Sequence, residues 1–348
     1  MRTARLRPGQ RPPPGLIGAV LTRDVVVDGE RWSKGRRLTG ADLDRFAAAS
    51  ADGGREVTVL VPGPADLHED EAAVRLATAV AGSGVEARPP AESRVDLRAA
   101  TDGVLRVDVG AVERIDRIDP LEVFTAFDGR VVAAGDLVAS VKVAPHVVAA
   151  AVVARGEAIG RRAGGIVSVE PFQSRRVGVV VSQSVGRLAR DRFEATVRSK
   201  LEALGSELVS IDYVEPEPER LATAFRGLTS GPEAVDLVLT AGAGSTDPLD
   251  PIFVALRRVG GRIVRRGVPA HPGSMLWLAR LGPVPMLGLP TCGAYSKATA
   301  ADLLLPRLLA GEPPTRATIA RLGHGGILTR DQRFRFPRYA RDLEGPEG

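Results

Sequence analysis

Short apolar runs alternate with amphipathic stretches through the second half of the chain. Arg175–Val181, Glu207–Tyr213 and Leu237–Leu239 have the apolar character of buried strands. The residues between them, over 187–204 and 218–228, place apolar side chains at helical spacing. Strands and helices that alternate in this way predict a parallel sheet with helices on both faces, which is a three-layer α/β/α domain.

The first half of the chain has a less regular pattern. Glu56–Val61 and Leu137–Val143 have strand character, and residues 68–80 and 147–159 have helical periodicity. His68 and the acidic residues after it suggest a helix start rather than a metal site, because neighbouring side chains on a helix point in different directions. This half therefore predicts a mixed α+β region.

Changes in composition divide the chain into four expected parts. The start is basic and proline-rich, and the end from Arg330 is charged, so both are expected to be disordered or frayed. The expected parts are disordered residues 1–14, an α+β accessory region over 15–170, an α/β domain over 171–312, and a C-terminal extension over 313–348.

The loop after Leu237–Leu239 is the most informative stretch of the sequence. It brings together small and polar residues, namely Gly242, Gly244, Ser245, Thr246 and Asp247. Asp250 is the expected N-cap of the next helix, and Pro251 is its expected first residue. Backbone N–H groups and the helix dipole at such a corner favour anions. The loop predicts either a phosphate-binding corner or an ordinary tight turn with helix caps.

Two further glycine segments follow the first one. They are Gly267–Ser274, with the sequence Gly-Val-Pro-Ala-His-Pro-Gly-Ser, and Gly288–Gly293, with the sequence Gly-Leu-Pro-Thr-Cys-Gly. In this order the three loops resemble those of the molybdopterin-binding domain found in molybdopterin adenylyltransferases and molybdotransferases. The resemblance extends from Arg176 to about Gly311. It implies an α/β fold, molybdopterin or adenylylated molybdopterin as the ligand, and Mg²⁺ as a further cofactor.

The resemblance also implies roles for individual residues. The ligand contacts that it implies are Gly242, Gly244, Ser245, Thr246, His271, Pro272, Gly273, Gly288, Pro290 and Lys297. Asp250 matches the catalytic aspartate of the family and is the expected metal ligand, and Asp247 is the second catalytic carboxylate. A helix cap and a turn would explain the same two carboxylates, so both interpretations stay open.

Two departures from the family pattern leave the function open. The Asp-Asn-Ser-Ala-Met-Asp-Gly-Tyr-Ala motif of molybdotransferases is absent from the first half, and Thr291-Cys292-Gly293 replaces the usual Gly-Asn-Pro ending of the third loop. One hypothesis is a transferase of molybdenum cofactor biosynthesis. The other is a non-catalytic carrier or sensor that delivers the cofactor to a molybdoenzyme or maturation partner. An unrelated phosphate-binding α/β protein would require an accidental match of three loops.

Composition narrows the classes of partner. The chain has 348 residues, a formal net charge of +5 and one cysteine. Lys and Arg are not interleaved with aromatic residues, so we expect no nucleic acid partner, and one cysteine excludes an internal disulfide. The sequence shows no long apolar run and no signal peptide, so we expect a cytoplasmic protein without a membrane partner. Relatives form dimers and trimers, which implies a homo-oligomer.

Overall fold

The computed structural model divides the chain into two compact units. The described residues are 1–49, 55–91, 93–183, 186–242, 246–289 and 298–342. The N-terminal unit comprises Met1–Thr101, Leu105–Asp128 and Ala133–Val169, and the C-terminal unit comprises Asp102–Val104, Gly129–Val132 and Glu170–Gly348. No helix in the described ranges is both long enough and apolar enough to cross a bilayer.

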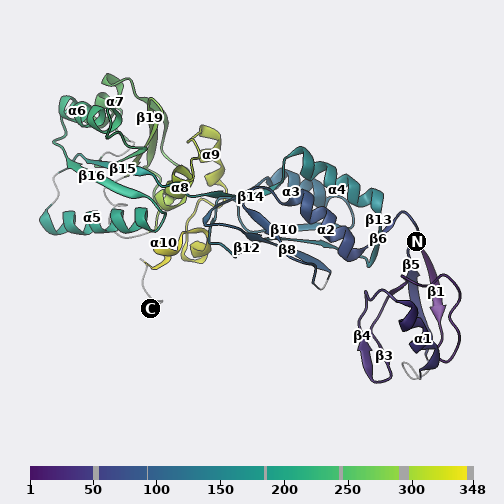
Figure 1. Ribbon diagram of the computed structural model, residues 1–348. Coiled ribbons are helices and arrows are strands. Elements are labelled where there is room, and N and C mark those ends of the chain that lie inside the picture. Colours follow the sequence, from purple (N-terminus) through teal and green to yellow (C-terminus); the bar gives the residue numbers. More distant parts are fainter. Residues whose placement is uncertain (50–54, 92, 184–185, 243–245, 290–297, 343–348) are drawn as a thin grey trace. The chain divides into compact units, whose positions relative to one another are not determined.

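The N-terminal unit combines helices with antiparallel sheets, which agrees with the predicted mixed α+β region. Its largest sheet has the strand order β10, β12, β8, β7, and α2 packs on β12 and beside α4 (Figure 1). The helices and strands of the first half of the chain are β1 Arg2–Leu6, β2 Val20–Leu21, β3 Val25–Val27, β4 Glu30–Trp32, α1 Gly40–Ala48, β5 Val57–Val61, β6 Asp66–His68, α2 Glu69–Val80, β7 Val85–Ala87, β8 Arg94–Ala99, β9 Gly103–Val107, α3 Val109–Asp116, β10 Leu121–Thr125, β11 Val131–Val132, β12 Leu137–Val143, β13 Val147–Ala149, α4 Ala150–Arg162 and β14 Val167–Pro171. β11 and parts of β9 and β14 belong to the C-terminal unit.

The start of the chain is ordered, although the sequence predicts disorder over residues 1–14. Arg2–Leu6 forms β1, which pairs antiparallel with β5, and Arg2 lies opposite Val61. Leu6 is fully buried. Backbone pairing with a distant strand and burial of one leucine stabilise this segment. Neither effect is visible in its basic, proline-rich composition.

His68 serves as the N-cap of α2 rather than as a metal ligand. The N–H of Asp70 donates to its Nδ1 at 3.2 Å, so Nε2 carries the proton and donates to the carbonyl oxygen of Gly35 at 2.8 Å. Both ring nitrogens are therefore used by hydrogen bonds. The interpretation of this segment as a helix start is confirmed.

The C-terminal unit is built on a sheet with the strand order β16, β15, β17, β20, β19, β18. Its helices and strands are β15 Arg176–Val181, α5 Arg187–Glu202, β16 Glu207–Tyr213, α6 Pro218–Thr229, β17 Leu237–Ala241, α7 Pro251–Arg258, β18 Arg262–Arg266, β19 Trp277–Leu281, β20 Val284–Leu289, α8 Ala300–Leu309, α9 Arg316–Ala320, the 3₁₀ helices η3 Arg321–Gly323 and η4 Arg330–Arg335, and α10 Arg338–Asp342. β19 is antiparallel to both of its neighbours, and the other described strands of this sheet share one direction. The sheet is therefore mixed but mostly parallel.

Side chains along the strands alternate between two hydrophobic cores. Val179, Leu239 and Leu287 belong to the core under α5 and α8. Val238 and Met286 belong to the core under α6 and α7. Because successive strand residues point to opposite faces, these two cores lie on opposite sides of the sheet. The expected three-layer arrangement is confirmed.

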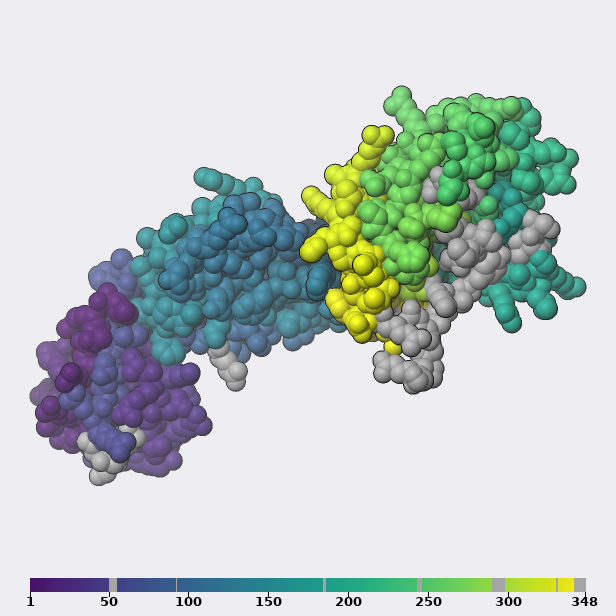
Figure 2. Space-filling model, turned by 180° about the vertical axis from the view of Figure 1, so that it is seen from behind, coloured from purple at the N-terminus to yellow at the C-terminus, as the bar shows by residue number. Residues whose placement is uncertain are grey.

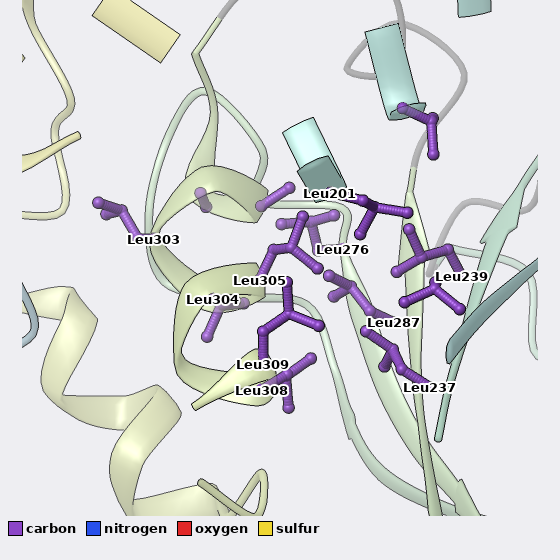
Figure 3. Packing of buried hydrophobic residues seen from close by; sticks show 14 of the residues in the cluster. Leu201, Leu237, Leu239, Leu276, Leu287, Leu303, Leu304, Leu305, Leu308 and Leu309 are labelled. Atoms are coloured by element: carbon purple, nitrogen blue, oxygen red, sulfur yellow. The ribbon is translucent and has the colours of Figure 1, made fainter. Parts of the chain in front are cut away.

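Leucines account for much of the core on the α8 side. Figure 3 shows Leu305 and Leu309 of α8 directed toward Leu287 of the sheet, with Leu201 of α5 beside them. Burying a leucine side chain contributes about 2 kcal/mol relative to leaving it exposed. With few aromatic residues in the chain, this contact holds α8 and the residues just before it against the sheet.

The described part of the C-terminal extension belongs to the same core. The sequence predicts fraying from Arg330, but η4 and α10 form there, and Phe336 and Ala340 are 3% and 0% exposed. In Figure 2 this yellow segment lies against the green residues of the same unit. One aromatic and one small apolar side chain anchor an otherwise charged segment.

Candidate functional site

The loops that carry the glycine segments leave the sheet from one edge. A single row of paired residues crosses all its strands, in the order Asp212, Val180, Thr240, Gly288, Trp277 and Arg266. The five strands that share a direction end within one residue of this row, at Tyr213, Val181, Ala241, Leu289 and Arg266. Neighbouring strands lie about 4.8 Å apart. The strand register therefore places the starts of the predicted loops at one edge of the sheet, at the carboxyl ends of these five strands, which we call the loop edge. A site shared by the glycine segments requires this arrangement.

Gly242 allows two of these loops to approach each other closely. It has a φ of +115°, and a Cβ added there would lie 2.9 Å from Oγ of Ser182 and 3.2 Å from its carbonyl carbon. The N–H of Ser182 donates to the carbonyl oxygen of Ala241 at 2.8 Å. A side chain at this position would be both strained and obstructed, so glycine is required. At Gly242 the backbone at the end of β17 therefore carries no side chain.

Asp250 is the N-cap of α7, and Pro251 is the first residue of that helix, as predicted. Its Oδ1 accepts a hydrogen bond from the N–H of Ile252 at 2.9 Å. Burial raises the pKa of Asp250, the N–H of Ile252 lowers it, and the charge of Asp247 raises it, with a net upward shift. A nearby cation would stabilise the charged form of this half-buried carboxylate, which burial disfavours.

Asp247 shapes the turn that leads to this helix. Its Oδ1 accepts a hydrogen bond from the N–H of Leu249 at 2.8 Å, and its carbonyl oxygen accepts one from the N–H of Asp250 at 3.3 Å. The cap and the turn thus use one carboxylate oxygen of each aspartate. Thr246 is exposed beside them. Gly244 and Ser245, which are also expected contacts, lie outside the described residues.

The second glycine segment is held in place by the C-terminal extension. The N–H of His271 donates to the carbonyl oxygen of Gly326 at 2.7 Å, and the N–H of Leu328 donates to the carbonyl oxygen of His271 at 2.8 Å. The His271 side chain is exposed. Arg265 adds a bond from Nε to the carbonyl oxygen of Gly267 at 2.9 Å. Backbone pairing therefore positions this loop and leaves the imidazole available to a ligand.

The same segment contacts the start of α8, which follows the third glycine segment. The His271–Pro272 peptide is cis, and the carbonyl oxygen of Pro272 accepts a hydrogen bond from the N–H of Ala300 at 2.9 Å. Gly273 has a φ of +108°, and a Cβ added there would lie 2.8 Å from the nitrogen of Ala300. Close packing therefore requires glycine at this position too.

Gly288 has a packing role that the motif does not reveal. It is buried, and a Cβ added to it would lie 1.9 Å from the ring of Trp277, its partner on β19. The indole ring occupies the space that a side chain would take. Pro290, Lys297 and Cys292, the remaining candidates of this loop, lie outside the described residues.

The carboxylates at this edge suit a weakly coordinated cation. No cluster of three or more His, Cys, Asp or Glu side chains forms a metal site within the described ranges. Mg²⁺ commonly takes one or two protein carboxylates and completes its shell with water and phosphate oxygens. Among the described residues only Ile252 donates a hydrogen bond to the Asp250 carboxylate, and burial raises its pKa, so Asp250 fits that role.

The sequence analysis did not identify Asp302, a buried carboxylate in the first turn of α8. Oδ2 of Asp302 accepts a hydrogen bond from the N–H of Thr299 at 2.9 Å, and its Oδ1 lies 2.7 Å from Nζ of Lys200. The Thr-x-x-Asp spacing is a visible signal for a helix N-terminus, because the two side chains can cap each other. No sequence signal pairs Asp302 with a lysine on α5.

Comparison with known proteins agrees with this arrangement. Residues 179–310 match the family model described as a probable molybdopterin binding domain, which confirms the resemblance to that domain. No protein of curated function matches the chain significantly.

Two solved structures illustrate the likeness. The molybdopterin biosynthesis enzyme MoaB of Thermus thermophilus is 23% identical, with a TM-score of 0.30, and the match covers 40% of this chain and 98% of that one. The molybdopterin biosynthesis MoeA protein of Pyrococcus horikoshii is 14% identical, with a TM-score of 0.31, and the match covers 71% of this chain and 80% of that one.

Proposed function

We propose that the loop edge of the C-terminal unit binds molybdopterin and that the protein acts in molybdenum cofactor biosynthesis. The observation that carries the proposal is the shared row of strand ends, which brings the loops after β15, β17, β20 and β18 to one edge. The match of residues 179–310 to a molybdopterin-binding domain model supports the same ligand.

The chemistry of the ligand suits the groups at this edge. The phosphate of molybdopterin would lie at the corner after β17, where Gly242 admits close approach and the N-terminus of α7 favours an anion. The exposed His271 side chain would contact the ligand from the second loop. Mg²⁺, held by Asp250, would neutralise charge on the phosphoanhydride of adenylylated molybdopterin.

We infer that the protein is a molybdotransferase-like or adenylyltransferase-like enzyme that works as a homo-oligomer. The competing function is a carrier or sensor that holds the cofactor for a molybdoenzyme. One observation favours the carrier: both Asp247 and Asp250 already serve as turn and cap residues, so their presence needs no catalytic role.

The test separates binding from chemistry. Purified full-length protein is titrated with molybdopterin, and Mg²⁺-dependent AMP release from adenylylated molybdopterin is then measured. Asp250→Asn retains a capping side chain but removes the charge, so the enzyme hypothesis expects binding within about two-fold of wild type and at least a ~100-fold slower release.

Each other outcome has a defined meaning. Wild type that binds but releases no AMP would rule out the molybdotransferase form of the enzyme. If it also forms no adenylylated molybdopterin from ATP, the carrier would be supported. Wild type that does not bind molybdopterin would contradict both hypotheses. Gly242→Ala should weaken binding, whereas Gly205→Ala, at a positive-φ glycine with no atom within 4 Å of the added Cβ, should not.

A further inference from the structure

Four arginine side chains line a groove between α3 and α4 of the N-terminal unit. It is open to solvent and has a volume of about 440 Å³. Arg114, Arg117, Arg155 and Arg162 lie around it, with Ile118 and Ile159 between them. All four arginines are exposed.

The helical spacing explains this arrangement. Arg155 and Arg162 are seven residues apart on α4 and share a face, with Ile159 between them. Arg114 and Arg117 are three residues apart at the end of α3 and face the same groove. The result is an apolar floor with guanidinium groups on both sides.

The arginines of the groove lack the carboxylates that the fold supplies to arginines nearby. Arg161, on the same helix, lies 3.3 Å from a carboxylate oxygen of Glu157. Arg114, Arg155 and Arg162 form no hydrogen bond or ion pair with any described residue, and Arg117 has only an exposed contact of 3.9 Å with Glu113. Like charges around one groove repel one another, and an anion bound among them would offset that repulsion.

The lining of the groove selects among anionic partners. Guanidinium groups bind carboxylates through two parallel hydrogen bonds, and an apolar floor accepts an aliphatic side chain. No aromatic residue lines the groove, so it offers no surface on which nucleic acid bases could stack. We propose that this groove binds an acidic segment of a partner protein, with its carboxylates on the arginines and an aliphatic side chain on the floor.

The experiment measures binding of a fluorescein-labelled peptide to the full-length chain by anisotropy. The peptide is a short amphipathic helix of glutamates with leucines on one face. Arg114→Ala/Arg155→Ala should weaken its binding at least ~10-fold, which corresponds to about 1.4 kcal/mol. Arg192→Ala/Arg198→Ala, a matched loss of two exposed charges on α5, should change it less than about two-fold. Because all four positions are exposed, both variants should keep the wild-type circular dichroism spectrum.

Three results would overturn the proposal. Equal weakening in the two double variants would mean general attraction to a basic protein. Equal binding of a peptide with serine in place of leucine would mean that the floor is not used. A single-stranded RNA of the same charge that displaces the peptide at lower concentration would reassign the groove to nucleic acid. None of these results affects the molybdopterin proposal, which concerns other residues.

Discussion

Lys200 and Asp302 form an ion pair beneath the loop edge, with 2.7 Å between Nζ and Oδ1. The lysine side chain is 13% exposed and the aspartate 1%. The second carboxylate oxygen of Asp302 accepts a hydrogen bond from the N–H of Thr299 at the start of α8. One buried carboxylate thus contacts both α5 and the start of α8, the helix that follows the third glycine segment. This contact helps to hold the start of α8 in place near the loop edge.

Lys200→Met should lower the free energy of unfolding of the C-terminal unit by about 3 kcal/mol, because it leaves Asp302 buried without its partner. Urea unfolding followed by Trp277 fluorescence, in a Trp32→Phe background, measures the change. Arg198→Met, an exposed position on the same helix, should change it little. A double-mutant cycle with Asp302→Asn should give a coupling of at least about 1 kcal/mol, and additive effects would contradict the pair.

Gly242→Ala should destabilise the unit by about 2 kcal/mol, since it combines a strained φ with a clash against Ser182. Gly205→Ala also has a positive φ, but its Cβ meets no atom within 4 Å, so its cost should be about 1 kcal/mol. The same urea experiment compares them. Equal costs would mean that Ser182 and its loop move aside freely.

Asp250 should make stability depend on pH in a defined direction. Its pKa is raised in the folded protein, so its contribution is fully present below the unfolded pKa of about 4 and is lost as pH rises through the folded pKa. Asp250→Asn keeps a cap without the buried charge and should be slightly more stable than wild type at pH 7. That difference should vanish below about pH 4.

A comparison of alanine with asparagine at position 250 tests the capping role of Asp250. Asp250→Ala removes the hydrogen bond to Ile252 and should lower stability at pH 7 by about 1 kcal/mol. If Asn and Ala are equally destabilising, the carboxylate charge rather than the cap stabilises this corner.

Tyr339 should make the C-terminal unit sensitive to alkali. Burial and the nearby carboxylate of Asp302 raise the pKa of its hydroxyl well above the usual value. Its contribution is present below the unfolded pKa of about 10 and is lost as pH rises toward the folded value. Tyr339→Phe should therefore lose less stability than wild type between about pH 8 and 11, measured by urea unfolding. A parallel loss in both proteins would contradict the assignment.

Much of the C-terminal unit could be predicted from local patterns. The predicted strand at Arg175–Val181 matches β15 to within one residue, the one at Glu207–Tyr213 coincides with β16, and Asp250 with Pro251 marks the start of α7. These signals are local, because strand burial and helix capping depend on a few neighbouring residues. The reversed direction of β19 was not predicted, because strand direction depends on how connections cross the sheet.

The sequence by itself determined much of the order of strands and helices, the three glycine segments and the helix cap at Asp250. Only the tertiary structure decided which residues meet: Lys200 with Asp302, the second loop with Gly326, and the indole of Trp277 with Gly288. Caps and turns act over a few residues, so sequence spacing encodes them. Contacts between distant segments depend on sheet register and packing, which no local pattern specifies.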